Sequence, residues 1–286
     1  MKKLHGISPI VTFIRVAVIA LPLWGLAGIS HAQINTDRMM NIGRNALAYD
    51  DYVLSISYFN LVINYKPHLY EPYFYRGVAK FYLDDYSGAA LDCTQAIQRN
   101  PYFPNTYELR GLAYINMNRF PDAIRDYRTV TDMLPENRSL WHNLALCYIE
   151  TDSLDQADSI TDIIIRRWAK QADGYTLKAQ VFLQRNDTAA AETYIDKAIE
   201  ADKYNIGAHT AKANILMSHE QYNEAIQHFD ESLRLNPKQA NTLINRALCH
   251  YHLNHYRDAM ADYDRALDLE PKNFIGHYNR GLLLVF

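Results

Sequence analysis

The chain has 286 residues, of which 49% are hydrophobic and 21% charged, and its formal net charge is −3. A chain without a basic excess lacks the footprint that nucleic-acid binding requires. Three cysteines in 286 residues do not make a disulfide framework. We therefore expect Cys93, Cys147 and Cys249 to be buried free thiols.

The first 32 residues have the composition of a secretory signal peptide. Lys2 and Lys3 give a positive start, residues 16–26 are mostly apolar, and the small residue Ala32 precedes Gln33. This order predicts cleavage after Ala32 and export to the periplasm, the extracellular space or the cell envelope. Cleavage leaves 26 Lys and Arg against 32 Asp and Glu, a net charge of −6. An uncleaved, membrane-tethered adaptor is the alternative, although Arg15 interrupts the apolar run.

A spacing of 34 residues recurs through the rest of the sequence. Small residues return at one position of the unit and prolines at another, and no insertion or deletion interrupts the 34-residue spacing. The small-residue series is Gly43, Gly77, Gly111, Ala145, Ala179, Ala213, Ala247 and Gly281, and the prolines are Pro67, Pro101, Pro135, Pro237 and Pro271. Such a period predicts one structural unit repeated along the chain.

One unit by itself predicts a pair of helices. Apolar residues recur at spacings of three and four over residues 105–116, and Pro121 suits the first turn of a second helix that ends before Pro135. Gly111 and Ala123 are small because the two helices approach closely there. One hairpin cannot bury its apolar face alone, so we expect the copies to stack.

The motif resembles the tetratricopeptide repeat, which combines a large residue, Leu-Gly, Tyr, Ala, an aromatic residue and Pro over 34 residues. The match is carried by Trp141, Leu144, Ala145, Tyr148 and Ala157 for the first half, and by Gly111, Tyr114, Ala123, Tyr127 and Pro135 for the second. Ala169, Lys203 and Thr161 depart from the pattern. The resemblance implies an all-α fold, an α-solenoid of helix-turn-helix units wound as a right-handed superhelix.

The expected organisation is a signal peptide over residues 1–32 and one repeat solenoid over residues 36–286. The repeats are expected at residues 36–69, 70–103, 104–137, 138–171, 172–205, 206–239 and 240–273, followed by a partial repeat at 274–286. The partial repeat ends in five apolar residues, where solenoids normally carry a polar cap. Three explanations are open: truncation of a longer array, which we favour, self-association through the open end, or docking onto a partner.

An Arg in front of the small residue is followed by an Asp sixteen residues later in three complete repeats. We expect an ion pair across each hairpin, and the three pairs are Arg76 with Asp92, Arg110 with Asp126, and Arg246 with Asp262. Arg280 stands at the same position but has no residue sixteen positions later. Because the motif recurs as part of the scaffold, we interpret these pairs as structural.

Neither a catalytic group nor a metal site is expected. His250, His252 and His255 cluster, but no Glu or Cys completes a ligand set at helical spacing. The sequence also lacks a phosphate-binding loop, a nucleophile elbow and a metalloprotease helix. We therefore expect no enzyme activity and no cofactor.

The resemblance further implies that the first helix of each repeat lines a concave surface that binds a peptide or protein segment. The positions that map onto this surface are Asn41, Arg44, Phe74, Tyr75, Phe81, Tyr82, Glu108, His142, Asn143, Glu150, Gln180, Asn214, Asn245 and Tyr251. Five acids against one base on this surface favour a neutral to basic partner, with an apolar anchor for Phe74, Tyr75 and Phe81. Asn41, Asn143, Asn245 and Asn279 share one position, which either holds a partner's backbone or is only the commonest residue there.

The sequence thus predicts a non-enzymatic scaffold that binds a protein partner during cell-envelope assembly. The alternative is the N-terminal part of a longer repeat protein whose effector or enzymatic domain follows. The partner, the pathway and the oligomeric state do not follow from these patterns.

Overall fold

The computed structural model describes residues 35–284, so the expected signal segment, residues 1–32, lies outside the described part of the chain. Between residues 35 and 284 the chain forms fifteen helices and no strand. The all-α fold class is therefore confirmed. Among these helices, none is long and apolar enough to cross a membrane.

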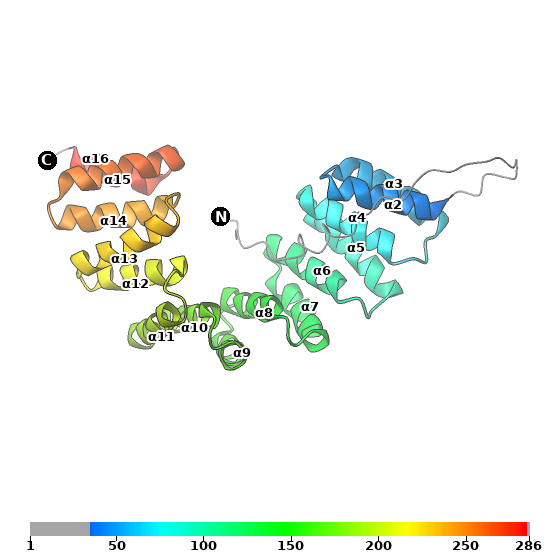
Figure 1. The fold of residues 1–286 in the computed structure, drawn as a ribbon, viewed down its shortest axis with the longest axis horizontal. Helices are drawn as coiled ribbons and strands as arrows, with labels where there is room; N and C mark the ends of the chain where they lie inside the picture. The colour runs from blue at the N-terminus through cyan, green and yellow to red at the C-terminus, as the bar shows by residue number, and fades with distance from the viewer. Residues whose placement is uncertain (1–34, 285–286) are drawn as a thin grey trace, which may run out of the picture. The chain divides into compact units, whose positions relative to one another are not determined.

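The helices belong to two compact units, divided between Thr151 and Asp152, within the fourth expected repeat. In the first unit, drawn blue to green in Figure 1, successive helices joined by short turns pack against each other. Its helices are α2 (Thr36–Ala48), α3 (Tyr52–Tyr65), α4 (Glu71–Tyr82), α5 (Tyr86–Arg99), α6 (Pro104–Asn116), α7 (Phe120–Met133) and α8 (Arg138–Glu150).

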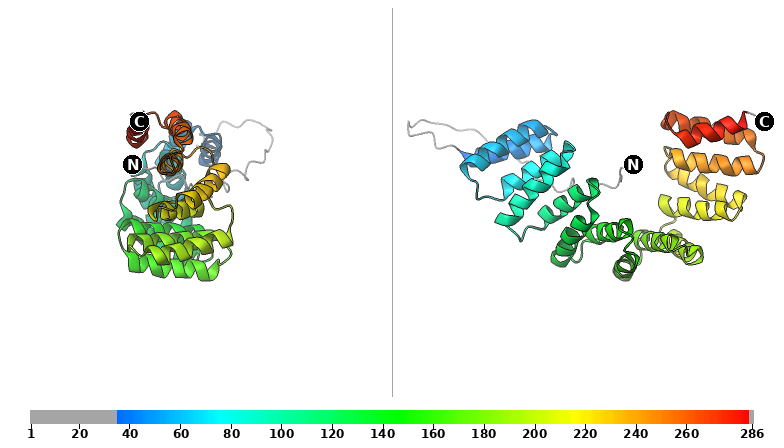
Figure 2. Two further views of the ribbon diagram at one scale, coloured as in Figure 1. Left: turned by 90° about the vertical axis from the view of Figure 1, so that its left-hand side faces the viewer. Right: turned by 180° about the vertical axis from the view of Figure 1, so that it is seen from behind.

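The second unit continues the same alternation of a 13-residue and a 14-residue helix, and Figure 2 shows its layers from behind. Its helices are α9 (Leu154–Arg167), α10 (Ala172–Gln184), α11 (Thr188–Ala201), α12 (Ile206–Ser218), α13 (Tyr222–Leu235), α14 (Ala240–His252), α15 (Tyr256–Leu269) and α16 (Phe274–Leu283). The last helix forms against α14 and α15, as its register predicts. It leaves Phe274, Ile275, Tyr278, Leu282 and Leu284 exposed.

The turn between the two helices of a repeat depends on one left-handed residue. Positive φ angles occur every 34 residues, at Asp50, Asp84, Asn118, Asp152, Asn186, Glu220 and Asn254. Asn and Asp tolerate this conformation better than other side chains with a Cβ, and Glu220 is the exception. The next residue often caps the second helix, since Asp51, Asp85 and Asp187 each accept from a backbone N–H three residues on.

The small residues mark the closest approach of the two helices in a hairpin. A Cβ added at Gly111 would lie 2.9 Å from Cε2 of Tyr127, and one at Gly43 would lie 2.7 Å from Cε1 of Phe59. Ala123 is fully buried. The expected crowding at Gly111 and Ala123 is therefore confirmed. The three cysteines are buried and free, which is also confirmed.

A second recurring contact joins a repeat to the one before it at four junctions. An aromatic or imidazole group near the start of a first helix donates to the carbonyl six residues earlier, at the end of the preceding repeat. The donors are Tyr73 to Pro67 at 3.2 Å, Trp141 to Pro135 at 2.8 Å, His209 to Lys203 at 3.0 Å and His277 to Pro271 at 3.0 Å. Lys203 supplies its carbonyl as well as a proline does, because the contact uses only the backbone.

Candidate partner-binding surface and the polar network behind it

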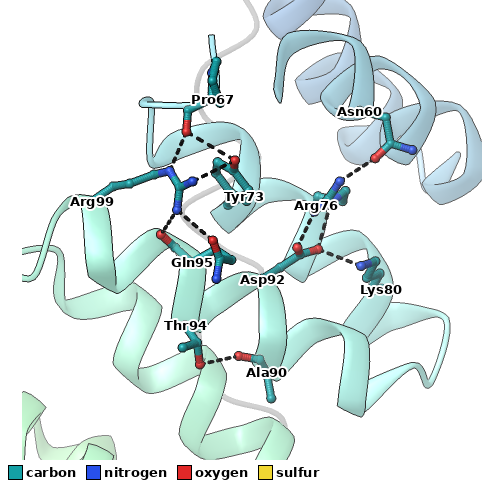
Figure 3. A network of polar contacts seen from close by, with 10 residues as sticks. All are labelled: Asn60, Pro67, Tyr73, Arg76, Lys80, Ala90, Asp92, Thr94, Gln95 and Arg99. Carbon is teal, nitrogen blue, oxygen red and sulfur yellow. Dashed lines mark hydrogen bonds and ion pairs between the residues drawn. The ribbon is translucent and has the colours of Figure 1, made fainter. Parts of the chain in front are cut away.

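The Arg in front of the small residue bonds to two second helices, one on each side of it. Arg76 on α4 donates from Nε and Nη2 to the two carboxylate oxygens of Asp92 on α5, at 2.8 and 2.5 Å. Its Nη1 donates to Asn60 on α3 at 2.6 Å. Figure 3 shows Arg76 between these partners, with Lys80 also paired to Asp92. One guanidinium therefore joins two neighbouring hairpins.

The same arrangement recurs at the other expected pairs. Arg110 bonds forward to Asp126 at 2.6 and 2.8 Å and backward to Thr94 at 3.0 Å. Arg246 bonds forward to Asp262 at 2.6 and 2.7 Å, and its backward partner is Asp230 at 2.5 Å. The forward partners were expected from the sequence. The backward partners were missed, although a polar residue sixteen positions before each Arg gave the signal.

Lysine at this position forms its ion pairs with backward partners. Lys178 on α10 pairs with Asp158 and Asp162 of α9 at 2.5 and 2.8 Å. Lys212 on α12 pairs in the same way with Glu192 and Asp196 of α11, at 2.9 and 2.7 Å. The two lysines therefore hold one repeat to the preceding one.

The backward contact also corrects the expectation that Arg280 lacks an acid. Its Nε donates to Asp264 on α15 at 2.5 Å, so the pair forms without a later helix. This bond requires only the preceding second helix. It therefore joins α16, the last described helix, to α15.

Burial sets the energetics of the forward pair. Asp126 is 3% exposed, and desolvation raises its pKa although the Arg110 guanidinium beside it acts in the opposite direction. The carboxylate is therefore costly to bury, and the ion pair offsets that cost. Such a pair contributes more to fixing the register of the helices than to net stability.

Removing the arginine of a forward ion pair should leave the desolvation cost of the buried carboxylate without compensation. We expect Arg110→Ala to lower the free energy of unfolding by about 3–5 kcal/mol, because it leaves Asp126 buried without its bidentate partner. Arg280→Ala is the matched control: its partner Asp264 is half exposed, so the loss should be about 1 kcal/mol or less. Urea denaturation followed by circular dichroism measures both variants. Equal losses would contradict the argument.

Two histidines, one on α12 and one on α13, lie close together near Lys212. His209 on α12 is 7% exposed, and its Nδ1 lies 3.0 Å from Nδ1 of His228 on α13. Because Nε2 of His209 faces the Lys203 carbonyl oxygen at 3.0 Å, that nitrogen carries the hydrogen and its Nδ1 accepts from His228. Only one proton fits between the two Nδ1 atoms. Burial, His209 and Lys212 lower the pKa of His228, while Asp196 opposes them.

Stability should therefore depend on pH through His228. Its pKa in the fold lies below the ordinary value of 6.5, so the unfolded chain takes up the proton first as the pH falls. Stability contributed by the neutral ring is complete above pH 6.5 and decreases below it. We expect His228→Gln to lose less stability than the natural chain between pH 7.5 and 5.5 in thermal melts. His219→Gln, which alters an exposed histidine of the same unit, should melt like the natural chain at both values. Identical pH dependence in all three proteins would contradict the assignment.

The expected aromatic anchor on the first unit is only partly at the surface. Phe74 is 5% exposed and packs edge-on against Phe103, with ring centroids 5.0 Å apart. It belongs to the core, so its assignment as a groove anchor is wrong. Phe81 is half-buried against Tyr86 at 5.2 Å. Tyr75 remains available as a half-buried ring.

The other expected surface residues of this unit differ in their exposure. Arg44 is exposed, donates to Asn41 at 2.5 Å and lies 5.9 Å from the ring centroid of Tyr75. Tyr82 is half-buried and stacks on Tyr52 at 5.2 Å. Glu108 is 7% exposed, so its assignment as a surface acid is wrong. Glu108 lies on the buried face of α6, together with Gly111 and Leu109. His142 is half-buried and Glu150 is exposed.

The shared Asn position divides into two kinds. Asn143 donates to the hydroxyl of Tyr127, sixteen residues earlier, at 3.2 Å, and Asn279 makes the equivalent contact with Tyr263. These two amides serve the packing. Asn245 faces Phe229 at the equivalent position, which has no hydroxyl, and it bonds instead to Asn214 of the neighbouring first helix at 2.9 Å.

The second unit therefore presents a polar first-helix surface. Asn214 is exposed, and Gln180, Asn245 and Tyr251 are half-buried. Tyr251 lies against Tyr256, with ring centroids 5.9 Å apart. These groups can donate and accept hydrogen bonds, which suits recognition of a peptide backbone. Stacked helical hairpins with such a surface define a solenoid repeat protein.

Comparison of the sequence with models of known protein families identifies the type of repeat. Tetratricopeptide repeat models match residues 108–158, 172–205, 206–239 and 240–273, together more than half of the chain. The chain therefore belongs to the tetratricopeptide repeat family. The last three ranges coincide with three of the 34-residue repeats expected from the sequence. Proteins of this family are generally non-enzymatic interaction scaffolds.

Relatives share parts of the array. The human protein "Anaphase-promoting complex subunit 7" is 30% identical over 130 residues, which are 45% of this chain and 23% of that protein. This chain thus spans about a quarter of that relative. A tetratricopeptide repeat protein from Parabacteroides merdae has a TM-score of 0.71 at 15% identity, covering 87% of this chain and 98% of its own. The Cut9–Hcn1 structure gives 0.63 at 12%, covering 87% and 46%. At these identities the solved structures show the fold alone.

Proposed function

We propose that this protein is a non-enzymatic scaffold that holds an extended segment of a partner protein on its first-helix surface. The partner segment lies across α12 and α14 in the second unit. The family and the fold support the scaffold role, since both are generally associated with protein interaction. The proposed setting is a bacterial cell envelope, where the scaffold assists assembly.

The observation that carries this proposal is the amide pair formed by exposed Asn214 and half-buried Asn245. Asn214 and Asn245 come from neighbouring first helices and share one hydrogen bond of 2.9 Å. Each amide offers two donors and an acceptor, so one shared bond leaves most of this capacity available. A peptide backbone carries the same groups at regular intervals. The pair therefore suits a backbone laid across the two helices.

The charge of the chain indicates the partner's composition. After the proposed cleavage the net charge is −6, and opposite charge increases the rate of association. A neutral to basic segment is therefore favoured. On the first unit, considered by itself, an apolar group of a partner would contact Tyr75 and Tyr82 rather than the buried Phe74.

The binding surface can be tested by substitution. A photo-reactive residue in place of Gln180 should crosslink the partner in the native host, and mass spectrometry would identify it. Asn214→Ala with Asn245→Ala should then weaken binding of that purified partner about tenfold or more, because several backbone hydrogen bonds are lost. Isothermal titration calorimetry measures the affinity.

The control replaces two amides away from this pair. Asn223 and Gln227 are exposed on α13, and changing both to Ala should leave the affinity within about twofold. Circular dichroism checks that both double variants keep their helices. A partner that binds the Asn214 and Asn245 variant at full affinity would refute the proposed surface.

Export is proposed from the composition of residues 1–32 and has a separate test. The mature protein should begin at Gln33, because Ala32 ends the cleavage motif. Amino-terminal sequencing of the protein from its native host measures this. Recovery from the membrane fraction with Lys2 and Lys3 retained would favour the tethered form instead.

A further inference from the structure

Two histidines and an aspartate meet at the turn between α14 and α15. His250 lies in the last turn of α14, His255 immediately precedes α15, and Asp258 lies in its first turn. One potential ligand atom from each residue lies within 4.8 Å of the other two. The backbone N–H of His255 donates to the carbonyl of His250 at 2.8 Å, which fixes the two residues relative to each other.

This group differs from the histidine cluster seen in the sequence. His252 is outside it, because its ring stacks on Tyr222 with centroids 4.6 Å apart. From the sequence, only Glu and Cys at helical spacing were considered as further ligands, and Asp258 was therefore missed. The turn folds α15 back along α14, and this brings Asp258 to the two imidazoles although it lies eight residues after His250.

The repeat fold already gathers these three positions around a cation elsewhere. Four repeats earlier the equivalent residues are Tyr114, Arg119 and Asp122. The guanidinium of Arg119 lies 4.6 Å from the Tyr114 ring centroid and pairs with Asp122 at 2.6 Å. In the seventh repeat, His250 replaces the tyrosine and His255 replaces the arginine, while Asp258 keeps the carboxylate. The position that the guanidinium fills in the third repeat therefore has no protein cation that is permanently charged.

The two histidines have unused bonding capacity. Nδ1 of His250 is buried and has no hydrogen-bond partner. His255 stands where Asp51, Asp85 and Asp187 cap their helices, yet its side chain accepts no capping bond. The unpartnered Nδ1 of His250 and the missing capping bond of His255 therefore leave a ligand atom of each imidazole without a role in the fold of this turn.

We propose that His250, His255 and Asp258 bind a divalent late first-row metal ion, for which zinc is the representative. Two imidazoles and one carboxylate are a donor set that zinc accepts at about 2.0–2.2 Å. His255 and Asp258 are exposed, so small side-chain rotations can bring the donors to that distance. Asp258 supplies the negative charge, because Asp262 nearby is already paired with Arg246.

Three protein ligands leave a fourth position for water or for a side chain of another molecule. The metal would also tie the end of α14 to the start of α15. The site is independent of the amide pair on α12 and α14, so the two proposals can fail separately.

The test uses the chain from Gln33 to Phe286 and two metal probes. Competition with a chromogenic zinc chelator should show one zinc ion per chain, and cobalt should give the visible absorption band of a four-coordinate site. His255→Gln and Asp258→Asn should each weaken zinc affinity at least tenfold. Both residues are exposed, so neither change should unfold the protein.

The control is His252→Gln, which alters a neighbouring exposed histidine outside the group and should leave zinc affinity within about twofold. Zinc should also raise the melting temperature of the natural chain but not that of His255→Gln. Absence of stoichiometric zinc binding would overturn the proposal. So would equal affinity in the natural chain and His255→Gln, which would indicate adventitious binding to other surface histidines.

Discussion

A cation at one position of six of the eight described first helices is the contact on which the register of those repeats depends. In the arginine form it bonds sixteen residues forward and sixteen backward, to the second helices on either side of it. The small residue behind it lets those helices come close enough for the bonds. Since both partners are fixed by the 34-residue period, a shift of one helix by one residue would break both contacts and bury a carboxylate without a partner.

The fold could be predicted from the sequence because this period is uninterrupted. Every contact that defines a repeat lies within about one repeat length, so the sequence of one unit contains the information for its hairpin and its neighbour. The forward ion pairs were visible for the same reason, because Arg and Asp vary together at a fixed spacing. The backward partners were harder to see, because Asn60, Thr94 and Asp230 share polarity but not residue type.

The candidate surface was less predictable, and the reason is geometric. Neighbouring residues of a helix point about 100° apart, so Phe74 and Tyr75 cannot face the same way. Phe74 takes the inward direction against Phe103, while Tyr75 stays at the edge. The aromatic content of α4 indicated an unusual segment but not which rings reach the surface. Glu108 shows the same limit, since the first-helix mapping placed it on the surface and its position on α6 gives burial.

The regular scaffold also determines which partner the amide at the shared Asn position bonds to. At the shared Asn position, the amide is held by a tyrosine hydroxyl wherever the earlier residue is Tyr127 or Tyr263. Phe229 keeps the ring that the packing needs but lacks the hydroxyl. Asn245 is thereby released from the interior contact and joins Asn214 at the surface. A single missing oxygen in the core thus changes the partner of this amide from a second-helix hydroxyl to a neighbouring first helix, without altering the fold of the repeat.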